Sequence, residues 1–207
     1  NKVHRNFSNN NLNISKLNTG RLLTYYAGEN CYCFQDSESK LLAFFYGSID
    51  NFKNLSERYS FQKKGNIAEL MICAFKTHGE DFAKHVKGAF VLFIFDQRMQ
   101  KFIAYKDHMG QKPFFFSKVN HFFVFSTDIK QIVKLGLEKH TLNRRRVIYF
   151  LTYLCGPKSE TFFENIFRVP ARNKLCVSKN LITLKEYYKF TKTKIAYSDK
   201  EVIKKLR

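Results

Sequence analysis

The sequence predicts an α+β fold, in which antiparallel sheets form a layered sandwich covered by helices. Strand-like runs recur along the chain between short polar stretches, and three segments have helical spacing of their apolar residues. The apolar run at residues 89–95 is too short for a buried helix and rich in Val, Ile and Phe, which predicts a strand buried on both faces. Such a strand needs another layer on each side. The 207 residues, 44% of them hydrophobic, are enough for one substantial core.

The N-terminal part predicts a hairpin followed by a helix. The first twenty residues are polar and Asn-rich. A strand pattern begins at residues 21–26 and resumes at residues 41–46 after the polar stretch 35–40, so the two runs are expected to pair. From Asn66 the apolar residues fall at i, i+3, i+4, i+7 and i+8, which predicts an amphipathic helix capped by Asn66 and ended near Gly79.

The rest of the chain alternates between strand and helix patterns. Strands are expected at residues 88–95, 101–106, 114–116, 121–125, 167–169, 174–177 and 181–185, and helices at residues 128–135 and 144–154. Many of the connections are short, which favours antiparallel pairing, with 88–95 at the centre of the sheet. The sequence contains no internal repeat, low-complexity linker or Pro-rich hinge, so one domain with a charged C-terminal extension is expected.

The net charge of +19 suggests an acidic partner such as nucleic acid, but its distribution argues against that role. The lysines are spread through every segment, and the only tight basic cluster is at residues 144–146. No stretch interleaves aromatic residues with Arg as RNA-binding sheets do. A basic nucleic-acid-binding module is therefore kept only as an alternative.

The cysteines and the longest apolar run argue against a disulfide-rich, a metal-binding or a membrane protein. Cys31, Cys33, Cys73, Cys155 and Cys176 are odd in number and lack CxxC spacing, so no disulfide framework and no metal site is predicted. Most of them are expected to be small core residues. The longest apolar run has seven residues, against the roughly 20 that span a bilayer, and no signal-peptide pattern occurs. We expect a soluble cytoplasmic protein that does not enter a membrane.

Seven short motifs follow one another in a fixed order along most of the chain. They are Gly-Glu-Asp-Phe at 79–82, Val-Lys-Gly-Ala-Phe-Val at 86–91, Ile-Phe-Asp at 94–96, Asp-His-Met-Gly-Gln-Lys-Pro at 107–113, Phe-Ser-Thr-Asp-Ile-Lys at 125–130, Phe-Glu-Asn-Ile-Phe-Arg-Val-Pro at 163–170 and Lys-Glu-Tyr-Tyr at 185–188. Each motif alone is a weak signal, but the ordered set closely resembles the asparagine synthetase family.

The resemblance implies the fold and the domain limits. The N-terminal half of that family is a class II glutamine amidotransferase of the N-terminal-nucleophile fold, a four-layer αββα sandwich of two antiparallel sheets. Residues 1–190 would form this glutaminase-like domain, and residues 191–207 would be a linker toward a synthetase domain that the chain lacks. Most of the matched motifs are structural in the family. Residues 107–113 would shape a turn around Gly110, and we do not expect Asp107 or His108 to be catalytic.

The resemblance also predicts that the catalytic nucleophile is absent. A glutaminase of this family uses a cysteine at its mature N-terminus, whose α-amino group carries the proton. Residue 1 is Asn1 here, and Cys31 and Cys33 are internal, so neither has a free α-amine. His4 and Arg5 match the family's H-R-G-P-D block, which implies that the chain begins there, without the first strand of the fold. We therefore expect no catalytic residue in this chain.

Three residues correspond to the family's oxyanion site. Tyr46 takes the place of the Asn whose amide donates to the oxyanion, and Ser48 takes the place of the following Glu. Gly47, whose backbone N–H also faces the oxyanion in the family, is retained. The resemblance therefore predicts that one of the two donors survives.

Three further positions correspond to the part of the pocket that holds the glutamine backbone. Arg21, followed by Leu22, matches the arginine that pairs with the glutamine carboxylate. The family's Asp that holds the glutamine ammonium falls at Ile67 or, with a shift of one residue, at Asn66. Because neither residue carries a charge, glutamine binding is in doubt.

The leading hypothesis is a degenerate glutamine amidotransferase-like domain that scaffolds an ATP-dependent amide-forming synthetase domain, in cis or in trans. The alternative is a fragment of an active glutamine-hydrolysing asparagine synthetase, which makes asparagine from aspartate, glutamine and ATP. ATP and Mg²⁺ would belong to the synthetase domain, so no cofactor is expected in this chain. Loss of the first strand would expose backbone groups, from which a homodimer or poor solubility is expected.

Overall fold

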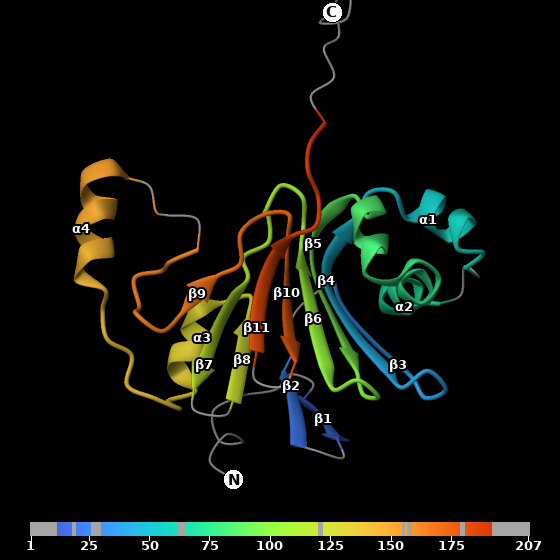
Figure 1. Ribbon diagram of the computed structural model, residues 1–207, viewed down its shortest axis with the longest axis horizontal. Helices are drawn as coiled ribbons and strands as arrows, with labels where there is room; N and C mark the ends of the chain where they lie inside the picture. Colours follow the sequence, from blue (N-terminus) through green and yellow to red (C-terminus); the bar gives the residue numbers. More distant parts are fainter. Residues whose placement is uncertain are drawn as a thin grey trace, which may run out of the picture.

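The computed structural model of the protein shows two antiparallel sheets packed face to face, with helices on their outer sides (Figure 1). It describes residues 12–17, 20–25, 30–61, 65–119, 122–154, 156, 159–178 and 181–191, with only the backbone for 12–17, 20–25 and 122. This arrangement confirms the predicted four-layer αββα sandwich. Of the linker expected at residues 191–207, only residue 191 is among the described residues.

The larger sheet has six strands in the order β11-β10-β6-β5-β4-β3. Its strands are β3 (Cys31–Asp36), β4 (Leu41–Ile49), β5 (Gly88–Asp96), β6 (Lys101–Lys106), β10 (Asn173–Ser178) and β11 (Leu181–Glu186). All neighbouring pairs are antiparallel, as the short connections predicted. The smaller sheet has the order β8-β7-β9, with β7 (Phe115–Val119), β8 (Phe122–Ser126) and β9 (Phe167–Arg168).

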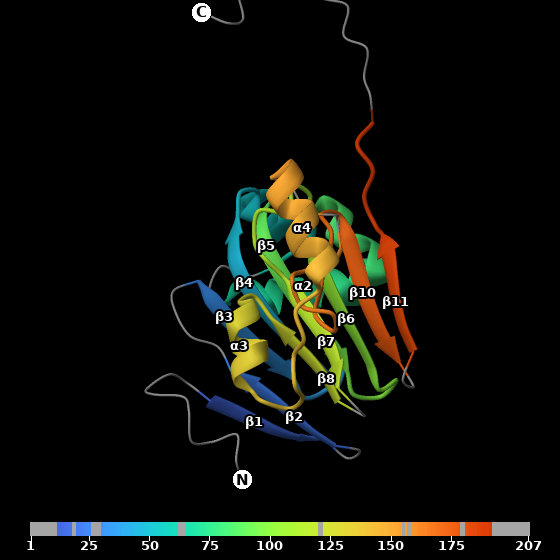
Figure 2. The ribbon, with the colours of Figure 1, turned by 90° about the vertical axis from the view of Figure 1, so that its left-hand side faces the viewer.

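Helices cover the outer face of each sheet (Figure 2). On the larger sheet lie α1 (Phe52–Arg58), α2 (Ile67–His78) and the 3₁₀ helix η2 (Gly79–His85), and on the smaller sheet lies α3 (Ile129–Lys134). Helix α4 (Arg144–Tyr153) stands at the outer side of the molecule. A separate two-stranded ribbon is formed by β1 (Leu12–Leu17) and β2 (Gly20–Tyr25).

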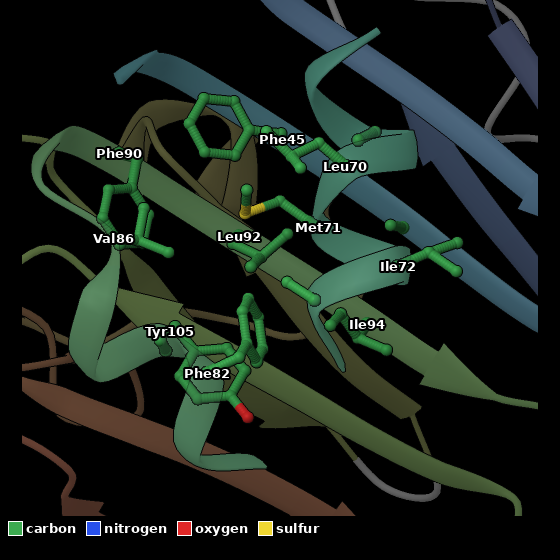
Figure 3. Close-up of a cluster of buried hydrophobic side chains, with 14 of the residues drawn as sticks. Phe45, Leu70, Met71, Ile72, Phe82, Val86, Phe90, Leu92, Ile94 and Tyr105 are labelled. Atoms are coloured by element: carbon green, nitrogen blue, oxygen red, sulfur yellow. The ribbon is translucent and has the colours of Figure 1, made fainter. Parts of the chain in front are cut away.

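Strand β5 is the centre of the structure because its two faces belong to different cores. Phe90, Leu92 and Ile94 face α2 and η2 in a core that also includes Met71 and Phe82 (Figure 3). The alternate residues Val91 and Phe93 face the smaller sheet. Full burial of each such side chain contributes about 1.5–3 kcal/mol. The prediction that residues 88–95 form a strand covered on both sides is confirmed.

Helix α2 begins and ends where the sequence predicts. The Asn66 side-chain oxygen accepts a hydrogen bond from the Glu69 N–H at 3.0 Å and so satisfies one free donor of the first turn. Gly79 follows the last turn with a φ of +57°, a conformation that glycine adopts without strain. Ala68, Leu70 and the other buried residues of α2 all pack into the core that faces β5.

The predicted hairpin between residues 21–26 and 41–46 is wrong. Strand β4 pairs with β3, and β2 pairs with β1. The polar stretch 35–40 contributes the end of β3 and a tight turn, in which Asp36 accepts hydrogen bonds from the N–H groups of Glu38 and Ser39 at 3.1 and 3.3 Å. This turn places β3 beside β4, so β3 and not the run at 21–26 pairs with that edge of β4.

The described cysteines are only partly buried. Cys31, Cys33, Cys73 and Cys176 all have intermediate exposure, and Cys176 packs against the core under η2. Cys155 lies outside the described residues. The cysteines thus lie at the margins of the cores rather than at their centres.

Two glycines let β4 and β5 approach closely beside the candidate site. Gly47 has a φ of +126°, and a Cβ there would lie 2.0 Å from the carbonyl oxygen of Ala89. Gly88 has a φ of +146°, and its Cβ would lie 2.2 Å from the carbonyl oxygen of Ser48. In both cases the obstacle is backbone, which cannot rotate away. Residues with side chains are therefore excluded at both positions.

We expect Gly88→Ala to destabilise the fold by at least about 3 kcal/mol, because strain at positive φ adds to a backbone clash. Gly79→Ala is the matched control, since Gly79 also has positive φ but no atom lies within 4 Å of its Cβ position. The control should cost less, about 1–3 kcal/mol, because it carries the backbone strain without the clash. Urea unfolding of the two variants measures the difference, and equal losses would contradict the close approach.

Candidate functional site

A row of four side chains crosses the larger sheet on the face toward the smaller sheet. Cys31 on β3 is opposite Tyr46 on β4, Tyr46 is opposite Val91 on β5, and Val91 is opposite Lys106 on β6. Opposite residues in antiparallel strands point to the same side, and Val91 belongs to the core between the sheets. The sequence-predicted position Tyr46 therefore lies on the inner side of the sandwich, near one end of the strands.

Lys112 reaches this row from the turn after β6. The side chain of Asp107 is fully buried, and its carboxylate accepts hydrogen bonds from the N–H groups of Met109, Gln111 and Lys112 at 3.0, 2.9 and 3.1 Å. Gly110 closes the turn at a φ of +71°. The turn holds the Lys112 ammonium 4.8 Å from the ring centre of Tyr46. Asp107 thus acts as a structural anchor.

The three positions that match the oxyanion site lie at the end of β4. Tyr46 presents a half-buried phenol ring beneath Lys112, and Ser48 is exposed. The Gly47 N–H, the donor expected to survive, donates to the carbonyl oxygen of Asn30 at 2.9 Å. An oxyanion at Gly47 would have to displace this backbone hydrogen bond.

Asn66 is occupied by structural hydrogen bonds at both ends of its amide. The oxygen caps α2, and the nitrogen donates to the carbonyl oxygen of Cys33 at 3.2 Å. The side chain thereby joins the start of α2 to β3. Ile67, the other position considered for the ammonium site, packs against the core that faces α2.

Arg21 and Leu22 lie in β2, opposite Lys16 and Ser15 of β1. Their side chains lie outside the described part of the structure. The expected pairing of Arg21 with a glutamine carboxylate therefore stays a prediction.

The two thiols near the row are poorly suited to nucleophilic attack. Burial raises the pKa of Cys31, although the Lys112 ammonium partly offsets that effect. Burial also raises the pKa of Cys33. A raised pKa leaves both cysteines as thiols at neutral pH. The reactive form is the thiolate, so neither cysteine is activated for attack.

Lys106, at the other end of the row, is a buried cation. Its ammonium donates to the carbonyl oxygen of Val169 at 3.0 Å, and only 4% of the residue is exposed. Burial lowers the pKa of Lys106, the charge of Arg168 lowers it further, and the neighbouring Asp107 opposes the shift. The hydrogen bond joins β6 to the segment that leads into β10.

Two arrangements of side chains were not anticipated from the sequence. His108 stacks on Tyr188 with ring centres 3.8 Å apart, which fixes the chain after β11 against the Asp107 turn. On the outer face, Glu80 forms ion pairs with Lys101 and with Lys174, the latter at 2.6 Å, beside a shallow pocket of about 230 Å³. These contacts join residues 21 and 94 positions apart, which no local pattern encodes.

The described residues offer no obvious place for a metal ion. No group of three or more His, Cys, Asp and Glu side chains within them could hold one. Nor does any helix in the described part have the length and apolar character needed to cross a membrane.

The sequence profile of a family described as "Glutamine amidotransferase domain" matches residues 13–188, which is most of the chain. The chain belongs to this family. Together with the relatives below, the match makes it a glutamine amidotransferase domain of the asparagine synthetase type. The resemblance seen in the ordered motifs is thereby confirmed.

The related proteins are much longer than this domain. A Methanocaldococcus jannaschii protein assigned as asparagine synthetase (glutamine-hydrolysing) 2 is 24% identical over 170 residues, which cover 79% of this chain and 33% of that protein. Asparagine synthetase (glutamine-hydrolysing) 3 of Bacillus subtilis is 28% identical over 88 residues, covering 42% of this chain and 14% of that protein. The chain thus spans about a third or less of the length of these relatives.

A solved structure supports the fold independently. The glutamine phosphoribosylpyrophosphate amidotransferase of B. subtilis, determined with ADP and GMP, superposes with a TM-score of 0.54 over 81% of this chain and 34% of that one. The sequences are 12% identical, so the likeness shows the fold alone. The predicted N-terminal-nucleophile type of sandwich is confirmed.

We expect Lys112→Met to raise the pKa of Cys31 and to leave that of Cys33 unchanged. The Lys112 charge lowers the pKa of Cys31, whereas burial alone shifts Cys33. The substitution spares the turn, because Lys112 joins the Asp107 carboxylate through its backbone N–H. Alkylation rates of each cysteine against pH, followed by mass spectrometry, measure both values. Parallel shifts at the two cysteines would contradict the placement of Lys112.

Proposed function

We propose that the chain is a degenerate glutamine amidotransferase domain, which does not hydrolyse glutamine and instead scaffolds an ATP-dependent amide-forming synthetase domain. One observation carries the proposal: the Gly47 N–H, which would stabilise an oxyanion, is hydrogen-bonded to the carbonyl oxygen of Asn30. The second expected donor, an Asn amide, is replaced by the phenol of Tyr46.

The chemistry of amide hydrolysis makes this loss severe. Attack on a glutamine side chain creates a tetrahedral oxyanion, and removal of one donor costs about 10²–10³ in rate. Here one donor is replaced and the other has an internal acceptor. A nucleophile from the described cysteines is also disfavoured, since burial raises the pKa values of Cys31 and Cys33.

Recognition of glutamine is weakened at the position that would hold its ammonium group. An unpaired ammonium in a partly buried site needs a counter-charge or several acceptors. Asn66 offers no negative charge, and both ends of its amide are already used to join α2 and β3. We infer that free glutamine is bound weakly or not at all.

The proposed scaffolding role is supported by what remains intact. Both cores, the Asp107 turn and the capped helix α2 are complete, although the pocket is altered. The relatives named as synthetases are at least about three times as long as the matched region, which supports a larger functional unit. ATP and Mg²⁺ would bind in the synthetase domain, in cis or in trans.

The rival proposal is an active glutaminase domain. It is favoured by the names of the synthetase relatives, which include glutamine hydrolysis. It requires a nucleophile and an oxyanion site that the described residues do not supply as arranged. A direct assay separates the two proposals.

The test is glutamate release by the full-length natural gene product, with glutamine as the substrate. We expect no release above the protein-free blank, both for the natural protein and for Tyr46→Asn, because the Gly47 N–H stays engaged in both. B. subtilis asparagine synthetase 3 serves as the positive control. Robust turnover, or a glutaminyl thioester detected by mass spectrometry, would overturn degeneracy.

Affinity purification of the tagged protein from its native cells tests the scaffold: a synthetase domain should accompany it, in cis or in trans.

A further inference from the structure

Helix α4 exposes apolar side chains that a globular domain normally buries. None of its ten residues is buried. Ile148 and Leu151 are 64% and 70% exposed, and their spacing of three places them on one side of the helix. Leu154, the left-handed residue that ends the helix, is 79% exposed. Contiguous apolar surface of this kind marks an interaction site.

The apolar surface continues beyond that stripe. The rings of Tyr149 and Tyr153 lie 4.7 Å apart on a neighbouring side of the helix, and both residues are exposed. Phe150 contacts Phe162 with ring centres 5.3 Å apart, and Phe162 is itself 43% exposed. Aromatic residues are enriched at the centres of protein interfaces. A helix that is apolar on most sides is stable in water only when something covers it.

Hydrogen bonds define both ends of α4 and join it to a neighbouring segment. Asn143 caps it by accepting from the Arg146 N–H at 3.2 Å, and the Leu154 N–H donates to the carbonyl oxygen of Phe150 at 2.7 Å. The Asn143 N–H donates to the carbonyl oxygen of Phe162 at 2.8 Å, and Arg146 pairs with Glu160. The last two contacts join α4 to residues 160–162, and the helix stands at the outer side of the molecule (Figures 1 and 2).

We propose that the apolar face of α4, defined by Ile148, Leu151 and Leu154, docks onto the ATP-dependent synthetase domain. This inference rests on the proposed function and names the surface through which the scaffold acts. The family match covers residues 13–188, and α4 lies within those limits. The matched region is 33% of the M. jannaschii relative, which leaves a much larger body to cover it.

The position of α4 fits this partner. Helix α4 lies toward the same end of the sandwich as the segment that follows β11, in both views (Figures 1 and 2). A domain connected through that segment would therefore lie at the end of the molecule where α4 is exposed. A synthetase domain on a separate chain could occupy the same place.

The charge of α4 specifies the chemistry of the opposing surface. Arg144 and Arg145 are exposed in the first turn, and that turn contains no acidic residue. Positive charge at a helix N-terminus is unfavourable against the helix dipole, and facing carboxylates relieve it. The synthetase surface should therefore offer an apolar groove with acidic residues at one end.

Two other occupants fit less well. In a membrane-surface helix, basic residues line the polar face along its length, whereas the three arginines of α4 all lie in the first turn. A second copy of the chain would have to meet α4 with the same surface, and α4 carries no acidic side chain that could face the arginines of its copy. Both occupants are outcomes that the experiment distinguishes.

The experiment places the photo-crosslinking residue p-benzoylphenylalanine at position 151 of the full-length natural gene product in its native cells. Position 99 is the matched control, because Met99 is 69% exposed and lies in the turn between β5 and β6. Mass spectrometry identifies the crosslinked peptides. We expect peptides from a synthetase domain at position 151, at least tenfold more abundant than at position 99.

The alternatives give different products. Peptides from residues 1–207 of a second copy, a lipid adduct, or no enrichment over position 99 would each overturn the docking proposal. Affinity purification without irradiation separates this failure from that of the proposed function. If a synthetase domain accompanies the protein but position 151 gives no adduct with it, only the docking proposal fails. If no synthetase domain is present, the scaffold function fails as well.

A substitution provides the second measurement. Leu151→Glu should reduce recovery of the crosslink from a probe at position 148 at least tenfold, and Met99→Glu should leave it unchanged. Both residues are exposed, so the thermal unfolding midpoint should stay the same in both variants. Equal recovery in the two variants would contradict a docking role for α4.

Discussion

The buried carboxylate of Asp107 connects the parts of the structure on which the candidate site depends. Its two oxygens accept three backbone N–H groups of the following turn, and its own N–H donates to the carbonyl oxygen of Phe90 on β5. Its carbonyl oxygen accepts from the Arg172 N–H, just before β10. A buried charge is tolerated only when it is satisfied in this way. The same turn places Lys112 over Tyr46 and His108 against Tyr188. The Asp107 carboxylate therefore positions both of these side-chain contacts.

The pocket residues and the core residues are held by different contacts. The pocket residues can therefore differ between proteins while the core stays the same. Strand β5 is held by packing on both faces, and none of the core side chains takes part in the pocket hydrogen bonds. The glycines at positions 47 and 88 are required by close backbone approach, whether or not an oxyanion is ever stabilised there. Retention of Gly47 is therefore no sign of retained catalysis. The same residue serves packing in any member of the fold with this strand spacing.

How much the sequence could predict depended on whether the interaction was local. The cap by Asn66, the end of α2 at Gly79 and the double burial of β5 follow from spacing within a few residues, and they were predicted correctly. The partner of β4 was missed because pairing depends on which strand the tight turn at 37–40 brings alongside. The acceptor of the Gly47 N–H and the ring beneath Lys112 are set by tertiary packing. No residue pattern indicated them, so the pocket was predicted less well than the fold.

The exposed apolar residues of α4 are not explained by the needs of folding. Residues kept only for folding should be buried or should satisfy the backbone, and Leu151 does neither. Because Leu151 is 70% exposed, we expect a polar replacement to leave the stability of the domain unchanged, so folding alone gives no reason for the apolar side chain. A surface role does give one, since an apolar helix face gains free energy only when a partner removes it from water. If the domain acts as the scaffold proposed above, that face is where its interaction with a partner should be sought.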